Sequence, residues 1–133
     1  MSEDAGAFAV EISGEHVRAL AAGVDRQHLV RLVRGEVAID VEIDLHGCNE
    51  RDARALVADT LAEMLREGER CARIVHGRGR HSLAGPVLKA ALLEWLTAPP
   101  LAQQVLAFAT AGPGAGGAGA TLVLLRRARA SGA

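Results

Sequence analysis

Residues 39–46 read Ile-Asp-Val-Glu-Ile-Asp-Leu-His, and this stretch decides the fold class. Its apolar and polar side chains alternate strictly, which predicts a half-buried strand. The same alternation puts Asp44 and His46 on one polar face of that strand. Gly47 then turns the chain, and Asn49 is a suitable N-cap for a following helix. The stretch therefore predicts a strand that leads through a short turn into a helix.

The elements that follow predict an α/β fold. They are a helix from Asn49 to Gly68, a strand at Cys71–Val75, a helix opened by Pro86 and closed by Pro99, and strands at Val105–Ala109 and Thr121–Arg126. This order favours a two-layer βαβαββ sandwich, with a four-stranded mixed sheet and two packing helices. We expect the first two strands to be parallel, joined by a right-handed crossover, and the last two to form a hairpin. The glycine-rich residues 112–119 look too flexible for regular structure.

A short helical leader is expected before the first strand. Residues 1–12 are predicted to be frayed, and helical patterns follow near Glu15–Ala22 and at Asp25–Gly35. This predicts two parts of the chain: an N-terminal extension over residues 1–38 and a functional domain over residues 39–133.

Composition excludes several classes of protein. The 133 residues are 50% hydrophobic, which suits one compact core rather than a disordered chain. No apolar run approaches the length of about 18 residues typical of a membrane span, so no membrane partner is expected. Aromatic residues make up only 2%, which argues against a surface built for base stacking. Two cysteines and an acidic start favour a reduced, cytoplasmic protein.

The formal charge of −1 hides a basic C-terminal half. From Arg70 onward there are eight basic side chains and one acidic side chain, Glu94. Such an excess favours a polyanionic partner, although arginines also coat ordinary soluble surfaces. Nucleic acid, either RNA or DNA, is the expected partner.

Asp44, His46 and His76 are the candidate catalytic residues. Ligands of α/β sheets gather beyond the carboxyl ends of parallel strands, where these three residues would converge. A histidine can exchange a proton near neutral pH, and a neighbouring carboxylate can fix its tautomer and stabilise the charged ring. A second histidine could act as the complementary acid or hold the scissile phosphate. These types of residue suit cleavage of a phosphodiester bond, in which an RNA 2′-hydroxyl can attack without a metal ion.

The loop after His76 is the candidate nucleic-acid contact. It precedes a helix N-terminus, where backbone amides and the helix dipole favour phosphate. The glycines allow close approach of a polyanion, and the arginines neutralise its charge. The predicted binding residues are Gly77, Arg78, Gly79, Arg80, His81 and Ser82.

The same residues have two alternative interpretations, an ordinary surface pair and a metal site. Asp44 and His46 could be an ordinary exposed pair on a strand. Two-metal chemistry needs several carboxylates, and the motifs offer only Asp44. The spacing of His46, Cys48, Cys71 and His76 matches no common zinc signature. No metal site or cofactor is therefore expected, while a requirement for divalent ions stays undecided.

Three short motifs resemble the Smr (small MutS-related) domain of stand-alone bacterial members. They are Asp44-Leu45-His46-Gly47, His76-Gly77-Arg78-Gly79 and Gly116-Gly117-Ala118-Gly119-Ala120-Thr121. The resemblance covers about residues 25–127 and implies a fold similar to the C-terminal domain of translation initiation factor three. It departs from many members at Arg78, where they have lysine; the charge is kept, but a planar fork replaces a point charge.

The resemblance implies an endonuclease, a hydrolase of phosphodiester bonds. It carries the catalytic Asp-x-His of the family onto Asp44 and His46, and the second motif onto His76, Gly77 and Gly79. Some bacterial members associate with ribosomes and cut mRNA where ribosomes stall or collide, so ribosome rescue is the function expected first. The alternatives are a DNA-nicking endonuclease in repair or recombination control, and a non-catalytic module that binds nucleic acid or the ribosome.

Overall fold

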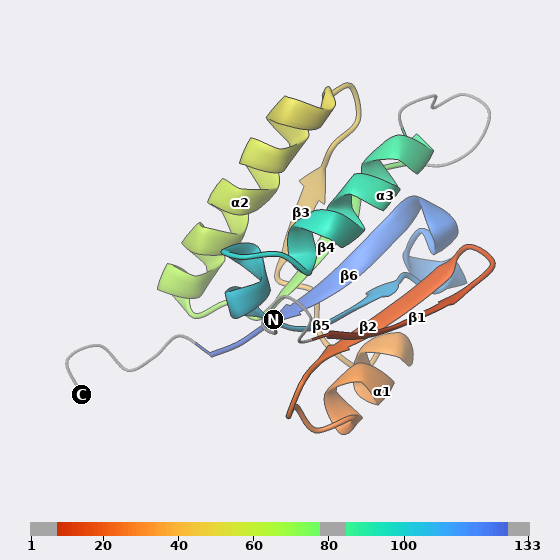
Figure 1. The fold of residues 1–133 in the computed structure, drawn as a ribbon, viewed down its shortest axis with the longest axis vertical. Helices are drawn as coiled ribbons and strands as arrows, with labels where there is room; N and C mark the ends of the chain where they lie inside the picture. Colours follow the sequence, from red (N-terminus) through yellow and green to blue (C-terminus); the bar gives the residue numbers. More distant parts are fainter. Residues whose placement is uncertain (1–7, 78–84, 128–133) are drawn as a thin grey trace.

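A six-stranded mixed sheet is the framework of the protein in a computed structural model that describes residues 8–77 and 85–127 (Figure 1). The spatial order of the strands is β1-β2-β5-β6-β4-β3. Strands β3 and β4 are parallel, and the other neighbouring pairs among these six are antiparallel. The strands are β1 (Phe8–Ser13), β2 (His16–Ala21), β3 (Val41–Asp44), β4 (Cys71–Val75), β5 (Val105–Thr110) and β6 (Ala120–Leu125).

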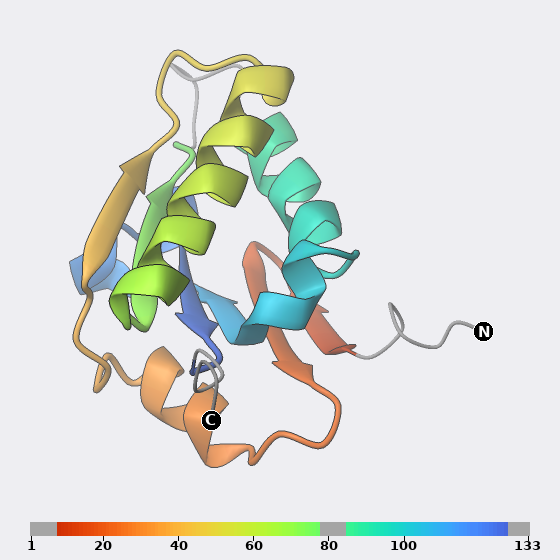
Figure 2. The same ribbon diagram turned by 90° about the vertical axis from the view of Figure 1, so that its left-hand side faces the viewer.

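Helices cover the two faces of the sheet to different extents (Figures 1 and 2). Helices α2 and α3 lie side by side over one face and enclose the larger apolar core with it. Helix α1 packs on the other face, where Leu29 and Leu32 share an apolar cluster with Leu122 and Leu124 of β6. None of the helices within the described ranges has the length and apolarity to cross a membrane. The helices are α1 (Gln27–Val33), α2 (Glu50–Glu67), α3 (Gly85–Leu96) and the short 3₁₀ helices η2 (Leu101–Gln104), η3 (Pro113–Ala115) and η4 (Gly117–Gly119).

The predicted strand–helix–strand unit is confirmed in β3, α2 and β4. The side-chain oxygen of Asn49 accepts the backbone N–H of Asp52 at 2.8 Å, so it caps α2 as expected. Gly68 ends the helix in the left-handed conformation, with φ at 77°. Between these ends, Val57, Leu61 and other apolar side chains of α2 are fully buried against the sheet. The α/β class and the parallel pairing of the first two predicted strands are therefore correct.

The predicted hairpin of the last two strands is also confirmed, with one difference in its connection. β5 and β6 pair in antiparallel fashion, and all six residues of β6 are buried. The glycine-rich residues 112–119 were expected to be irregular, yet they form the short helices η3 and η4. Gly116 and Gly117 have positive φ values of 112° and 56°, which glycine adopts without strain. The segment is thus a compact turn with defined backbone hydrogen bonds.

The prediction for the start of the chain is wrong in part. Residues 1–7 of the expected frayed segment lie outside the described residues, but residues 8–12 and the expected helix at Glu15–Ala22 form the β1–β2 hairpin instead, so the sheet has six strands rather than four. The edge of β5 provides backbone partners for β2, and this pairing outweighs the weak helical propensity of so short a segment. The second predicted helix is confirmed as α1, and Asp25 accepts the N–H of Gln27 at 2.9 Å before it. The division of the chain at residue 38 stays a prediction.

A side-chain hydrogen bond ties this hairpin to the rest of the sheet and can be tested. The hydroxyl oxygen of Thr110 accepts the backbone N–H of Val17 at 2.8 Å. We expect Thr110→Val to lower the free energy of unfolding by about 1–3 kcal/mol, because the half-buried N–H of Val17 loses its partner. Thr97→Val is the matched control, since the Thr97 hydroxyl donates only locally, to the carbonyls of Leu93 and Glu94 in the preceding helix. Urea unfolding measures both, and equal stability of Thr110→Val and wild type would contradict this anchoring.

Candidate functional site

The two predicted motifs leave the sheet at the same edge. Asp44 and Val75 are register partners in the parallel pair β3 and β4, and the N–H of Leu45 donates to the carbonyl of Val75 at 2.8 Å. His46 and His76 therefore follow directly after paired strand ends. This is the position at which α/β sheets commonly present ligand-binding groups.

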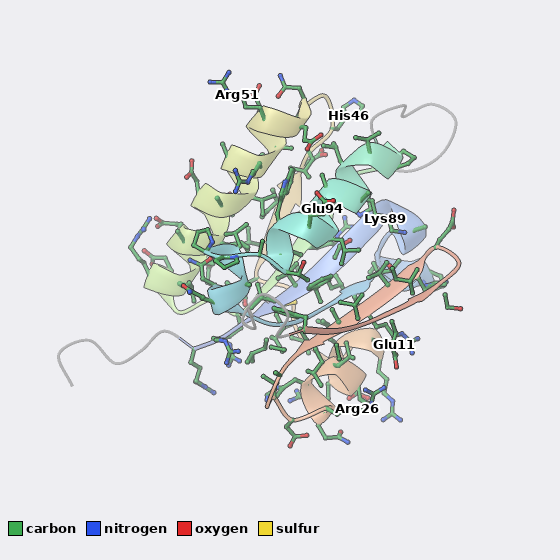
Figure 3. All side chains as sticks on the ribbon, in the orientation of Figure 1. Glu11, Arg26, His46, Arg51, Lys89 and Glu94 are labelled. Carbon is green, nitrogen blue, oxygen red and sulfur yellow. The ribbon has the colours of Figure 1, made fainter. Side chains whose placement is uncertain are left out.

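The turn after β3 is organised by the Asp44 carboxylate. Its Oδ1 accepts the backbone N–H of His46 at 2.9 Å, a local bond that ends the strand at Asp44 rather than at His46 as expected. Gly47 continues the turn with φ at 82°. Asp44 and His46 are both exposed, and Figure 3 shows His46 at the same end of the molecule as Arg51 at the start of α2. The turn thus holds an imidazole in solvent beside a carboxylate.

His76 lies in a different environment from His46. Only 2% of its surface is exposed, and its Nε2 lies 3.0 Å from the hydroxyl oxygen of Thr121. Its Nδ1 lies 3.2 Å from the carbonyl oxygen of Gly77, and because a carbonyl only accepts, this contact places a proton on Nδ1. In the neutral ring Nε2 then accepts the Thr121 hydroxyl. Both ring nitrogens are engaged by the protein itself.

The electrostatics of His76 favour this neutral ring. Burial lowers its pKa below the ordinary histidine value, because a charged imidazolium loses solvation. The bond to the Gly77 carbonyl opposes this shift, and the positive charge of Lys89 adds to it. His76 is therefore uncharged at neutral pH.

The structure brings the three predicted residues to one edge without direct contact between their side chains. Among the described residues, no hydrogen bond joins Asp44 to the ring of either histidine. Asp44 points to the α1 face, since its neighbours Ile43 and Leu45 belong to the core under α2 and α3. Along β4 the same alternation turns His76 toward α2 and α3, where Thr121 meets it.

The glycine-rich turn fixes the second motif by main-chain bonds. The N–H groups of His76 and Gly77 both donate to the carbonyl of Gly119, at 3.0 and 2.9 Å. Gly77 is half-buried and has φ at 84°. In the sequence, Thr121 stands out only as the last residue of the third motif. Its bond to His76 depends on β6 lying next to β4, and the spacing of the motifs does not predict this neighbourhood. Of the predicted phosphate-binding residues, Arg78, Gly79, Arg80, His81 and Ser82 lie outside the described residues.

A hollow of about 320 Å³ opens beside Gly77. Its wall includes Pro86 and Lys89 of α3 and the hairpin turn at Gly14 and Glu15. The Lys89 ammonium group donates to the Glu15 carbonyl, so it links α3 to the hairpin. Lys89 was not among the predicted contacts. Its position about one turn into the helix that follows the second motif could have indicated a positive charge near this site.

Cys71 belongs to no metal site among the described residues, and its thiol is protonated. Within residues 8–77 and 85–127, no three His, Cys, Asp or Glu side chains gather as a metal site. Cys71 begins β4 and His76 follows its end, which separates them by the length of the strand. Burial raises the pKa of the Cys71 thiol to about 11, so this group is protonated and unreactive at neutral pH.

Comparison with known proteins identifies the family to which this chain is similar. The Smr domain family matches residues 43–126, which contain the β3, β4 and β6 motifs. Ribosome rescue factor SmrB of Aliivibrio salmonicida is 38% identical over 109 residues, covering 82% of this chain and 57% of that protein. The SmrB of Yersinia enterocolitica is 36% identical over 108 residues, covering 81% and 57%. The chain thus spans a little over half the length of these relatives.

Two solved structures share the fold. YdaL, a stand-alone small MutS-related protein from Escherichia coli, aligns with a TM-score of 0.69 and 27% identity, covering 83% of this chain and 82% of YdaL. The Smr domain of Thermus thermophilus MutS2 aligns with a TM-score of 0.56 and 34% identity, covering 65% of this chain and 99% of that domain. Because the family match spans more than half of its residues and a relative is 38% identical over 82% of it, this chain belongs to the Smr domain family.

Proposed function

We propose that this protein is an endonuclease that cuts RNA, and that its substrate is mRNA held on a ribosome. The observation that carries the chemistry is an exposed imidazole, His46, held by the turn that Asp44 organises at the carboxyl edge of β3. The names of the SmrB relatives support the ribosomal substrate. A ribosomal substrate in turn implies the cytoplasm as the place of action.

His46 acts as the general base in this proposal. Its neutral ring takes the proton of a ribose 2′-hydroxyl, and the 2′-oxygen attacks the adjacent phosphorus. A 2′-oxygen–phosphorus bond forms while the bond to the 5′-oxygen breaks, and the leaving oxygen takes a proton from water or from the charged His46. The products are a 2′,3′-cyclic phosphate and a 5′-hydroxyl end.

Asp44 has two functions in this reaction. Its hydrogen bond to the backbone N–H of His46 fixes the position of that residue in the turn. Its negative charge, two residues away, stabilises the imidazolium that forms. The exposure of both side chains gives a strand of RNA access to them. The reaction as proposed takes its nucleophile from the substrate, so it is the 2′-hydroxyl that distinguishes RNA from DNA.

His76 has a positioning function in this proposal. Its ring is buried and bonded at both nitrogens, and it supports the start of the loop at Gly77. The loop residues predicted from the sequence are proposed to contact the phosphates, and Lys89 adds a positive charge in the hollow beside Gly77. The proposed phosphate-binding residues are Gly77, Arg78, Gly79, Arg80, His81 and Ser82.

Removal of the general base gives the first functional prediction. We expect His46→Ala to lower the rate of RNA cleavage by about 10²–10⁴-fold, because the 2′-hydroxyl loses its proton acceptor. His16→Ala is the control, since His16 is another exposed histidine, on β2. The measurement is single-turnover cleavage of a labelled RNA on collided ribosomes and free in solution. Equal rates for His46→Ala and wild type would remove His46 from the mechanism.

The bond between His76 and Thr121 gives a second prediction. Thr121→Val removes the hydroxyl that the buried ring requires, and we expect kcat to fall by up to about a hundredfold as the loop start shifts. Thr121→Ser keeps the hydroxyl and is expected to retain kcat. The steady-state values of kcat and KM separate this effect from weakened binding. A serine variant as impaired as the valine variant would contradict a role through this bond.

The neutral ring of His76 also predicts a pH dependence of stability. An unfolded histidine takes up a proton near pH 6.5, whereas the buried ring resists protonation until a lower pH. The unfolded chain therefore binds more protons in this range, and stability falls as the pH drops below about 6.5. Urea unfolding between pH 7.5 and 5 measures this, with His76→Gln as the comparison. Parallel profiles for the two proteins would contradict the buried neutral state.

A further inference from the structure

A second hollow, of about 270 Å³, lies at the other end of the sheet from His46. Figures 1 and 2 place α1 at that end and the turn between β3 and α2 at the opposite end. Four nitrogen-bearing side chains line this hollow, which we call the arginine hollow. They are His28 and Arg31 of α1, Arg70 directly before β4 and Arg127 shortly after β6, with Val37 and Leu124 as apolar neighbours.

The fold rather than the local sequence gathers these side chains. β4 and β6 are antiparallel neighbours, so the start of one and the end of the other meet at the same edge. Arg70 is also held in place, because its Nε donates to the carbonyl of Leu125 at 2.9 Å. That bond uses one of the five N–H groups of a guanidinium and leaves the others for a ligand. A partly fixed arginine loses less entropy when it binds.

The arginine hollow is poor in neutralising acid. Its lining contains no Asp or Glu among the described residues, and within them no ion pair involves Arg31, Arg70 or Arg127. Asp40 is the nearby negative charge that acts on Arg70, but its Oδ2 accepts the backbone N–H groups of Arg70 and Cys71 at 2.8 and 3.1 Å and forms no ion pair with the guanidinium.

The charges in the hollow also act on one another. Burial lowers the pKa of Arg70, and the positive charge of Arg127 lowers it further, while Asp40 opposes the shift. By contrast Arg73, in the middle of β4, is paired with Glu42 at 2.7 Å. An anion between Arg70 and Arg127 would relieve this repulsion.

We propose that the arginine hollow is a phosphate-binding site that holds the nucleic-acid backbone away from the cleavage site. Forked guanidinium groups from three segments suit the oxygens of a phosphodiester. From Arg70 to the end of β4 the protein strand spans about 17 Å, so an RNA strand of several nucleotides is needed to reach both ends. Leu124 and Asp44 lie toward the same face of the sheet, the face that α1 covers in part.

The identity of the polyanion as RNA rests on the proposed function, whereas the phosphate chemistry rests on these side chains alone. The test therefore measures binding in a His46→Ala background, which separates it from cleavage. In that background Arg31→Gln and Arg127→Gln are combined, because both side chains are exposed and their loss spares the fold. The matched control carries Arg34→Gln, an exposed arginine beside α1 that does not line the hollow.

The probe is a labelled 20-nucleotide single-stranded RNA, titrated at several salt concentrations. We expect the double variant to bind about tenfold more weakly, with a salt slope reduced by about 0.7 for each phosphate that is no longer neutralised. The control is expected to change affinity less than about twofold. An equal loss of affinity per charge removed in the control would overturn the site, since it would indicate only general attraction.

Inorganic phosphate distinguishes a second source of the same chemistry. Its binding is measured by chemical shifts of arginine side-chain N–H groups in the same proteins. Loss of phosphate binding in the double variant, together with weaker RNA binding, supports the proposal. Loss of phosphate binding with unchanged RNA affinity would overturn it, because the hollow would then serve a free anion. Neither result depends on whether the protein cleaves RNA, so failure of the nuclease proposal is seen separately.

Discussion

The parallel pairing of β3 with β4 is the constraint on which the site depends. Asp44 lies opposite Val75 in this register, so the chain leaves both strands at one level of the sheet. A slip of one residue would turn Asp44 into the core and Ile43 out of it. The buried side chains Ile43 and Ile74 oppose such a slip. Precision at the proposed active edge therefore comes from the core beneath it rather than from contacts between the site residues.

The sheet also separates two kinds of surface. At one end the carbonyl of Gly119 holds the main chain directly after β4, and His76 is buried neutral against Thr121. At the other end Arg70 and Arg127 lie close together with little neutralising acid. A protein whose total charge is near zero can thus carry a strongly basic local surface, here the arginine hollow. In the proposed complex one RNA molecule contacts both ends of the sheet. It is cut at the end that carries His46 and is held at the end that carries the arginine hollow.

Prediction from the sequence succeeded where one periodicity was strong and local. The alternation at 39–46 and the cap at Asn49 were sufficient for the parallel unit, because both signals lie within a few residues. It failed at Glu15–Ala22, where an alanine-rich segment fits a helix and a strand equally well and the edge of β5 decided the outcome. The sequence also did not predict the different environments of His46 and His76, because the burial of His76 depends on β6. The roles of the site residues remain predictions.

The ribose 2′-hydroxyl is the nucleophile of the proposed reaction, and His46 activates it. The most direct measurement compares two strands of identical sequence, one of RNA and one in which every ribose is replaced by 2′-deoxyribose, with the ends of any product identified by mass spectrometry. We predict that only the RNA is cut and that its new ends are a 2′,3′-cyclic phosphate and a 5′-hydroxyl. Cleavage of the deoxy strand at a comparable rate, or RNA products ending in a 5′-phosphate, would contradict the account.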